Sequence, residues 1–172
     1  MCAKRIIMVT GGQRSGKSMF AERVALELSD HPVYIATAEP RDDEFRERVR
    51  LHRQRRGSEW TNIEEQLHLS VHDVTSRTVL VDCVTMWATN IFFHCGEDLD
   101  RSLAMFRREY DALIASTDTT FIFVTNEIGL GGTSSNAMQR RFTDLLGIAN
   151  RHVAESADEV HMLISGIDLK IK

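Results

Sequence analysis

The chain has 172 residues, enough for one α/β domain with a sizeable core, so a single domain over residues 1–172 is expected. Its formal net charge of −4 at pH 7 argues against a nucleic-acid-binding surface over the whole molecule. No apolar run approaches the ~18 residues of a membrane span and the three cysteines lack C-x-x-C spacing, which predicts a cytoplasmic protein without a membrane span, disulfide framework or structural zinc site.

The chain opens with a strand, a glycine-rich turn and a helix. Residues 6–9, IIMV, are typical of a buried strand, and the turn at residues 11–18 reads GGQRSGKS. This turn fits the pattern G-x-x-x-x-G-K-[ST] without a mismatch, and the alternative is a turn that matches by chance. Apolar residues at helical spacing then predict the buried face of the helix: Met19, Phe20, Ala25 and Leu28.

Each residue type in the turn has a role in binding an anion. The glycines let consecutive backbone N–H groups curl around a phosphate at the start of a helix. The Lys17 ammonium would reach the β- and γ-phosphates of a nucleoside triphosphate, and the Ser18 hydroxyl would ligate the bridging Mg²⁺. The predicted phosphate-binding residues are Gly11, Gly12, Gln13, Arg14, Ser15, Gly16, Lys17 and Ser18.

A second strand is expected at residues 33–38, VYIATA. Strand ends in open parallel sheets face ligands, so Ala36, Thr37 and Ala38 are candidate nucleotide contacts. Small residues at a strand end are equally typical of close packing, and the pattern leaves both interpretations open.

Residues 42–56, DDEFRERVRLHRQRR, predict a helix with acidic residues in its first turn. Phe45, Val49 and His52 fall on one stripe, with arginines within about one turn of the histidine. In one interpretation, His52 lies at the edge of the apolar face and the arginines are solvated. In the other, the guanidinium groups lower the pKa of His52 below its reference of about 6.5, and a neutral ring nitrogen acts as a nucleophile on a triphosphate that the arginines bind.

Two further strands lead to acidic residues. Residues 60–63 predict a short strand, after which Glu64 would bind a nucleotide or remain solvated. Residues 78–82, TVLVD, end in Asp82, a pattern in which an aspartate beside the phosphate-binding loop holds Mg²⁺ through its water shell. Ser18 and Asp82 are thus the predicted Mg²⁺ ligands, and an ordinary strand-end aspartate is the alternative.

The second half of the chain predicts helices, one more buried strand, a polar loop and a closing hairpin. Their expected ranges are 83–93, 99–115 and 136–156 for helices, 120–124 for the strand, 125–135 for the loop, and 159–164 with 167–172 for the hairpin. The stripe Met86, Trp87 and Ile91 indicates core or a subunit interface. Asn126 and Glu127 are candidate binding residues, because loops at the carboxyl ends of parallel strands carry ligand contacts.

Several motifs together resemble one protein family. They are GGQRSGKS, YIATAE, R-V-x-x-H-R with further arginines, VDC, VTNEIGLG and the terminal SGIDLKIK. The family is the bifunctional adenosylcobinamide kinase and adenosylcobinamide-phosphate guanylyltransferase of cobalamin assembly and salvage. The resemblance covers essentially the whole chain. It implies an α/β P-loop fold, RecA-like, with a mainly parallel central sheet flanked by helices and a C-terminal β-hairpin.

The resemblance implies a reaction in two halves. ATP or GTP phosphorylates the aminopropanol hydroxyl of adenosylcobinamide, and Lys17 with Mg²⁺ stabilises charge on the transferred group. A histidine then attacks the α-phosphorus of GTP, pyrophosphate leaves, and adenosylcobinamide phosphate takes the GMP to give adenosylcobinamide-GDP. His52 matches the position of this nucleophile, which favours the second interpretation of that residue.

The resemblance also implies contacts beyond the phosphate-binding loop. The matching nucleotide-binding positions are Ala36, Thr37, Ala38, Arg53, Gln54, Arg55, Arg56, Glu64 and Asp82. The family shows glutamate as well as aspartate at the position of Asp82, and either carboxylate can hold Mg²⁺. A homotrimer whose subunits complete each other's sites is further implied, with contacts expected on the helix from Asp42 and on the helix of Met86 and Trp87.

Two other classes of protein share parts of this pattern. A small-molecule P-loop kinase would need the loop and Asp82 but no nucleophilic histidine, and it would carry no covalent nucleotide. A RecA-like regulatory or motor module would use the basic helix to contact DNA or a partner. The net negative charge and the lack of aromatic residues within residues 46–56 argue against single-strand binding.

Overall fold

A computed structural model describes residues 4–39, 47, 50 and 56–172 of the chain. The helix predicted over residues 42–56 lies mostly outside this range. The predicted site residues outside the described part are His52, Arg53, Gln54 and Arg55. Arg56, the last residue of the predicted helix, is described.

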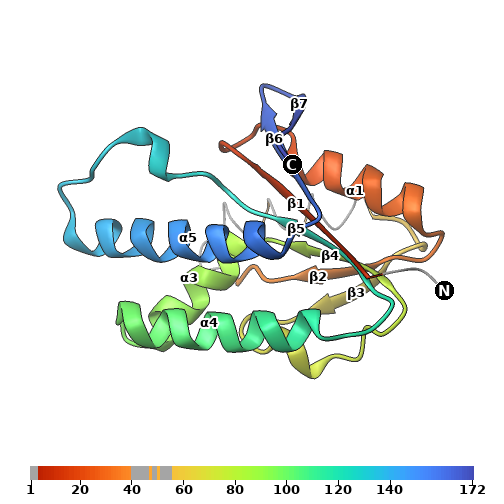
Figure 1. Ribbon diagram of the computed structural model, residues 1–172, viewed down its shortest axis with the longest axis horizontal. Coiled ribbons are helices and arrows are strands. Elements are labelled where there is room, and N and C mark those ends of the chain that lie inside the picture. Colours follow the sequence, from red (N-terminus) through yellow and green to blue (C-terminus); the bar gives the residue numbers. More distant parts are fainter. Residues whose placement is uncertain (1–3, 40–46, 48–49, 51–55) are drawn as a thin grey trace.

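The centre of the molecule is a seven-stranded sheet with the order β3-β2-β4-β5-β1-β6-β7 (Figure 1). The strands are β1 (Arg5–Gly11), β2 (Val33–Ala36), β3 (Thr61–Glu64), β4 (Thr78–Asp82), β5 (Thr120–Val124), β6 (Glu159–Ile164) and β7 (Ile167–Lys170). Neighbouring strands run parallel except β6 and β7, which form an antiparallel hairpin. The prediction of a mainly parallel sheet with a C-terminal hairpin is confirmed.

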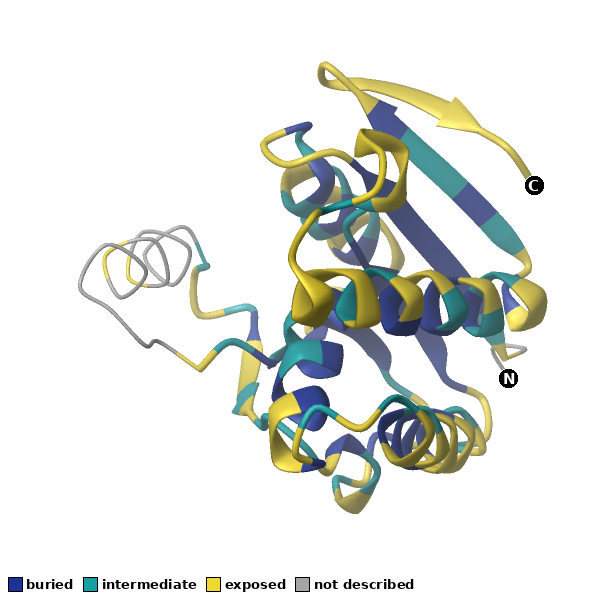
Figure 2. Cartoon of the chain, turned by 90° about the vertical axis from the view of Figure 1, so that its left-hand side faces the viewer, coloured by how far each residue is buried: buried dark blue, intermediate teal, exposed yellow. Residues whose placement is uncertain are grey.

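Helices cover both faces of this sheet, so that the strands form a buried band between partly exposed helices (Figure 2). The helices are α1 (Lys17–Leu28), α3 (Val84–His94), α4 (Leu99–Ile114) and α5 (Ala137–Ser156), with short 3₁₀ turns η1 (Leu69–Val71) and η2 (Gly129–Gly131). Ile7 and Val9 of β1 pack with α1, whereas Ile6 and Met8 face the core under the other helices. Strands covered on both faces read as continuous apolar runs, as these do. Among the helices that the structure describes, none has the length and apolar character needed to cross a membrane.

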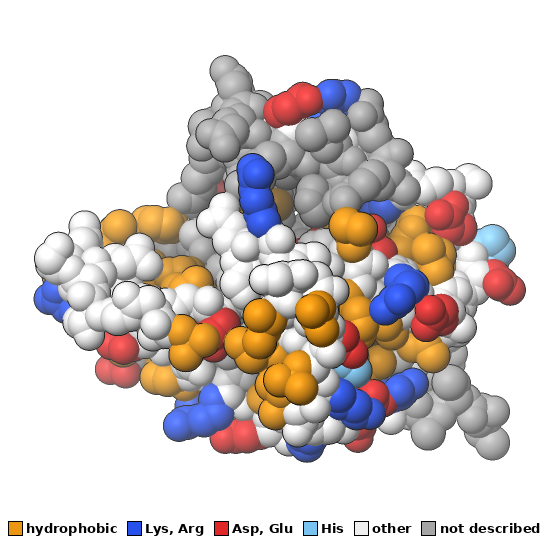
Figure 3. Space-filling view, turned by 90° about the horizontal axis from the view of Figure 1, so that it is seen from above, with side chains coloured by type: hydrophobic (Ala, Val, Ile, Leu, Met, Phe, Trp, Pro, Cys, Tyr) orange, Lys and Arg blue, Asp and Glu red, His pale blue; other side chains and the backbone are white. Residues whose placement is uncertain are grey.

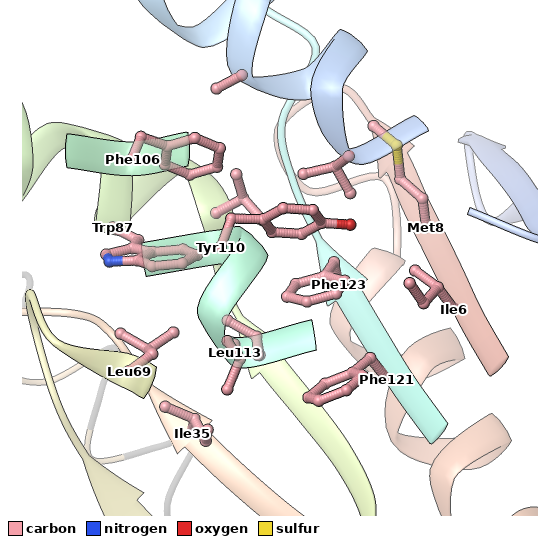
Figure 4. Close-up of a cluster of buried hydrophobic side chains, with 14 of the residues drawn as sticks. Ile6, Met8, Ile35, Leu69, Trp87, Phe106, Tyr110, Leu113, Phe121 and Phe123 are labelled. Carbon is pink, nitrogen blue, oxygen red and sulfur yellow. The ribbon is translucent and has the colours of Figure 1, made fainter. Parts of the chain in front are cut away.

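The larger core lies between the sheet and the three helices α3, α4 and α5 (Figure 4). The rings of Trp87 and Phe106 pack at 4.9 Å between centroids, and Tyr110 packs on Phe123 at 5.2 Å. Trp87 has 0% of its surface exposed, and its indole N–H donates to the Leu67 carbonyl at 2.9 Å. Of the two alternatives for this stripe, core or subunit interface, Trp87 belongs to the core, and a subunit contact through other residues of this helix stays a prediction.

The buried face of α1 differs in part from the prediction. Met19 and Leu28 are 63% and 41% exposed, whereas Lys17, Ala21 and Ala25 are buried. These three residues are spaced four apart and therefore lie on one face of the helix. The face that carries Lys17 into the interior also brings the two alanines against the sheet. Their small side chains suit a helix packed closely on the strands, and the predicted residue Phe20 also packs against this core cluster, whereas Met19 and Leu28 fall outside the contact.

The C-terminal strand β7 is an exposed edge strand. Ile167 and Leu169 are 73% and 54% exposed, and hydrophobic side chains gather on the face in Figure 3, the side on which the hairpin lies in Figure 1. Polar contacts secure the hairpin to β1: Lys170 Nζ lies 2.8 Å from Glu159 Oε2, and Arg5 also binds the Glu159 carboxylate. Ion pairs thus join β1, β6 and β7.

These ion pairs predict a specific acid sensitivity. Hydrogen bonds from Lys170 and Arg5 lower the pKa of Glu159 from 4.5 to about 2. Because the folded-state pKa is depressed, the stabilisation is fully present above the unfolded pKa and is lost as the pH falls from about 4.5 toward 2. We therefore expect Glu159→Gln to be less stable than the unaltered chain near neutral pH and to lose less stability in that acid range, as measured by thermal unfolding. Glu27→Gln on the exposed side of α1 serves as the control, and an equally steep acid loss in both variants would contradict the assignment.

Candidate active site

The carboxyl ends of three neighbouring strands meet at one edge of the sheet, because β5 lies between β1 and β4. The phosphate-binding loop, residues 11–18, follows from β1, Asn126 comes shortly after β5, and Asp82 ends β4. A cavity of about 450 Å³ lies here, a volume within the usual range of small-molecule sites. It is lined by Gln13, Arg14, Ser15, Gly16, Lys17, Ser18, Met19, Tyr34, Ala36, Ala38, Arg56, Asp82, Cys83, Met86, Val124 and Asn126.

The phosphate-binding loop depends on glycine at two positions. Gly16 has a left-handed backbone (φ 94°) and caps the start of α1, so the helix N-terminus opens toward the cavity. Gly11 has φ 146°, and a Cβ placed there would lie 2.4 Å from the carbonyl oxygen of Leu163. Gly12 has open space around it. The sequence pattern alone did not separate these roles.

Two later segments of the chain hold this loop from the outside. The backbone N–H of Glu127 donates to the Gly11 carbonyl at 3.1 Å, and the N–H of Gly166 donates to the Ser15 carbonyl at 3.0 Å. Gly166 belongs to the turn between β6 and β7, so the hairpin at the end of the chain fixes the loop at its start.

Lys17 is buried at the base of the cavity. Its ammonium donates to the Gly12 carbonyl at 2.5 Å and lies 3.4 Å from the Ser15 hydroxyl. Burial lowers the pKa of Lys17 from its usual value, and the opposing influences are the neighbouring Cys83 and Asp82. The amine is therefore held inside the curl of the predicted phosphate-binding loop.

Asp82 is tied to Tyr34 on the neighbouring strand β2. The Tyr34 hydroxyl donates to Asp82 Oδ2 at 2.6 Å. Arg56 stacks its guanidinium on the Tyr34 ring, 3.8 Å from the centroid, and donates to Asn62 Oδ1 at 2.6 Å. One aromatic side chain thus contacts both the acidic and a basic member of the cavity wall.

Asn126 is held by a buried polar network. Its backbone N–H donates to the Thr85 hydroxyl at 2.8 Å, and its carbonyl accepts from Asn150 Nδ2 at 3.1 Å. The Thr125 hydroxyl donates to Asn150 Oδ1 at 2.7 Å and lies 3.3 Å from the Thr85 hydroxyl. These bonds fix the backbone of Asn126, a residue of the cavity wall.

The remaining predicted residues lie around the cavity rather than in it. Thr37 is fully buried, and its hydroxyl bonds both the N–H and the carbonyl of Cys83 at 2.8 Å, which is a packing role at the end of β2. Glu64 is exposed at the end of β3 and is outside the cavity lining. The Glu127 carboxylate accepts from its own loop, at the N–H of Gly129, 2.8 Å away. The strand that includes Thr37 in the prediction ends at Ala36 in the structure.

Sequence reasoning missed five residues of the wall: Met19, Tyr34, Cys83, Met86 and Val124. Tyr34 lies within an apolar run, where its hydroxyl was the one available signal. Cys83 follows Asp82 directly, and burial, with the Asp82 charge, raises the pKa of its thiol to about 12. This thiol therefore stays protonated near neutral pH and is a wall group rather than a nucleophile.

The donors in the cavity suit Mg²⁺ better than a transition metal. The Ser18 hydroxyl and the Asp82 carboxylate are hard oxygen ligands, and both line the cavity. Within the described ranges, no group of three or more His, Cys, Asp and Glu residues could hold a metal by itself. Such a donor set fits an ion that shares its coordination with substrate phosphates and water.

The two adjacent glycines give a matched test of the loop. We expect Gly11→Ala to lower the free energy of unfolding by at least about 2 kcal/mol, because it forces an unfavourable φ and a clash with the Leu163 carbonyl. Gly12→Ala has room for its Cβ and should change stability by less than about 0.5 kcal/mol. Urea denaturation of the two variants measures the difference, and equal stability would contradict the packing of the hairpin on the loop.

Comparison with known proteins extends the assignment. Residues 7–171 match the family described as cobinamide kinase / cobinamide phosphate guanyltransferase. The bifunctional adenosylcobalamin biosynthesis protein CobU of Escherichia coli (strain K12) is 38% identical over 181 residues, which cover 97% of this chain and 99% of that protein. The protein of the same name from Salmonella typhimurium (strain LT2) is 36% identical over 183 residues, with 97% and 99% covered.

Solved structures support the fold. An ATPase from the type III secretion system of pathogenic bacteria is 15% identical, with a TM-score of 0.54, and the match covers 93% of this chain and 51% of that one. This likeness confirms the P-loop ATPase type of fold. The family match over nearly the whole length confirms the resemblance seen in the motifs: the chain belongs to the cobinamide kinase / cobinamide phosphate guanyltransferase family.

Proposed function

We propose that this chain is a bifunctional transferase that phosphorylates adenosylcobinamide with ATP or GTP and then transfers GMP from GTP to the product. The observation that carries the proposal is the cavity that Lys17 and Ser18 of the predicted phosphate-binding loop share with Asp82 at the end of β4. The family match supplies the class of substrate, because the relatives are named for adenosylcobalamin biosynthesis.

In the kinase half, Lys17 and the backbone N–H groups at the start of α1 hold the triphosphate. The hydroxyl oxygen of adenosylcobinamide attacks the γ-phosphorus, the bond to the bridging oxygen breaks, and ADP or GDP leaves as the hydroxyl proton is released. Lys17 is already directed into the curl of the loop, so it stabilises the developing charge without a large rearrangement.

In the guanylyltransferase half, a ring nitrogen of His52 attacks the α-phosphorus of GTP and pyrophosphate leaves. A phosphate oxygen of adenosylcobinamide phosphate then attacks the same phosphorus, the nitrogen–phosphorus bond breaks, and the histidine is regenerated. His52 lies outside the described residues. The support for its role is the R-V-x-x-H-R match in the sequence and the position of Arg56, four residues later, in the cavity wall.

Ser18 and Asp82 are the proposed protein ligands of Mg²⁺. When bound, this ion neutralises charge on the phosphates and helps to orient them. The oxygen donors of both side chains fit this role, as does the cavity they share with Lys17.

A homotrimer is also part of the proposal, on the basis of the family resemblance. Trp87 is buried in the chain's own core, so other residues would have to make the contacts. Light scattering after size-exclusion chromatography tests it, and a mass near the 19.6 kDa of one chain would reject it.

The transferase half is tested by covalent labelling. Incubation with α-³²P-labelled GTP and Mg²⁺ should give a protein label that survives alkali and is lost in acid, as expected of a phosphoramidate. His52→Ala should carry no label but should still transfer the γ-phosphate of ATP or GTP to cobinamide. His31→Ala, which alters an exposed histidine before β2, is the control and should label normally.

The outcomes separate the candidate functions. An unlabelled wild-type protein that still transfers γ-phosphate would be a P-loop kinase without guanylyltransferase activity. A label that persists in His52→Ala would place the nucleophile on another residue.

A further inference from the structure

Tyr34 is a buried polar residue in a strand of otherwise apolar character. It is 3% exposed and packs in the core cluster between the sheet and α1. Its backbone pairs with Leu80 of β4, and Asp82 lies two residues further along the same strand. Since residues two apart on a strand share one face, the Tyr34 side chain reaches along this face toward the cavity and meets Asp82.

The ring of Tyr34 is fixed from two sides. Trp60 makes an edge contact, with centroids 5.6 Å apart and planes at 81°, and Arg56 stacks 3.8 Å from the centroid. Aromatic contacts of this geometry restrict the ring to one orientation. Trp60 and Arg56 thus hold the ring in place independently of the hydrogen bond between its hydroxyl and Asp82.

The hydroxyl occupies only one of the two carboxylate oxygens. It donates to Asp82 Oδ2 at 2.6 Å, and within the described part of the chain no hydrogen bond is made to Oδ1. A carboxylate oxygen can only accept, so the Tyr34 phenol is the donor in this bond. A charged acceptor held by such a donor has fewer accessible rotamers.

We infer that Tyr34 is a positioning residue that orients the Asp82 carboxylate toward Mg²⁺ bound with the nucleotide. The inference rests on the proposed Mg²⁺–nucleotide site. Tyr34 contacts the ligand residue and not the metal, so its effect appears in how strongly Mg²⁺ assists nucleotide binding. Binding that does not involve the metal should depend little on the hydroxyl.

Tyr34→Phe isolates this effect, because it removes the hydroxyl and keeps the ring between Trp60 and Arg56. The measurement is the affinity for a fluorescent GDP analogue, first in EDTA and then over a Mg²⁺ titration. We expect the Mg²⁺ concentration at half-maximal effect to rise about tenfold, the scale of one hydrogen bond to a charged group. The affinity in EDTA should stay within about twofold of wild type.

Tyr110→Phe is the matched control, since Tyr110 is the other of the two tyrosines in the chain. Its hydroxyl also hydrogen-bonds within the protein, to Ser156 of α5 at 2.5 Å. Tyr110 belongs to α4, however, and packs in the larger core on the other face of the sheet. This variant should leave the Mg²⁺ midpoint unchanged even if its melting temperature falls. Melting temperatures of both metal-free variants show whether either substitution disturbs the fold.

Each result has a distinct meaning. An unchanged Mg²⁺ midpoint in Tyr34→Phe would overturn the inference, as would an equal loss of affinity with and without Mg²⁺, which indicates a general distortion of the cavity. A wild-type protein whose nucleotide affinity does not respond to Mg²⁺ would instead remove the proposed metal site, and the inference with it.

Discussion

The candidate active site depends on the curled backbone of residues 11–18, the predicted phosphate-binding loop. A loop of this kind presents several N–H groups to one point, and its carbonyl groups must find partners elsewhere. Here the partners come from distant segments, because the Gly11 carbonyl accepts from Glu127 and the Ser15 carbonyl from Gly166. The first functional motif is thus completed by the end of β5 and by the last hairpin, and the fold must close before the loop is fully supported.

The strand order determines which side chains meet that loop. Because β5 is inserted between β1 and β4, the residues after β5 lie between the loop and Asp82. The Thr85, Thr125 and Asn150 network satisfies buried polar groups at this point and fixes the backbone of Asn126. A sheet with β4 directly beside β1 would have no room for a third polar segment in the same wall.

The limits of prediction follow from what each signal contains. Buried strands such as residues 78–82 and 120–124 were placed correctly, because strands covered on both faces give continuous apolar runs. The face of α1 was predicted correctly at Ala25 and Phe20 but wrongly at Met19 and Leu28, because large apolar residues were included without regard to their position around the helix. Tyr34 was missed because its partner is 48 residues away, a distance at which periodicity carries no information. The role of His52 remains a prediction from the motif.

The local charges of the cavity differ from those of the chain as a whole. The net charge of −4 gives no sign of the proposed triphosphate site, yet Arg14, Lys17 and Arg56 line the cavity, and Asp82 is the one carboxylate among its described lining residues. The charge of Asp82 acts on Lys17, where it opposes the lowering of the pKa by burial. The Tyr34 hydroxyl provides a neutral partner for this carboxylate, while the ring holds Arg56 by its face. Tyr34 therefore contacts both kinds of charge in the cavity wall, and it gives the carboxylate a neutral hydrogen-bond donor in addition to the cations around it.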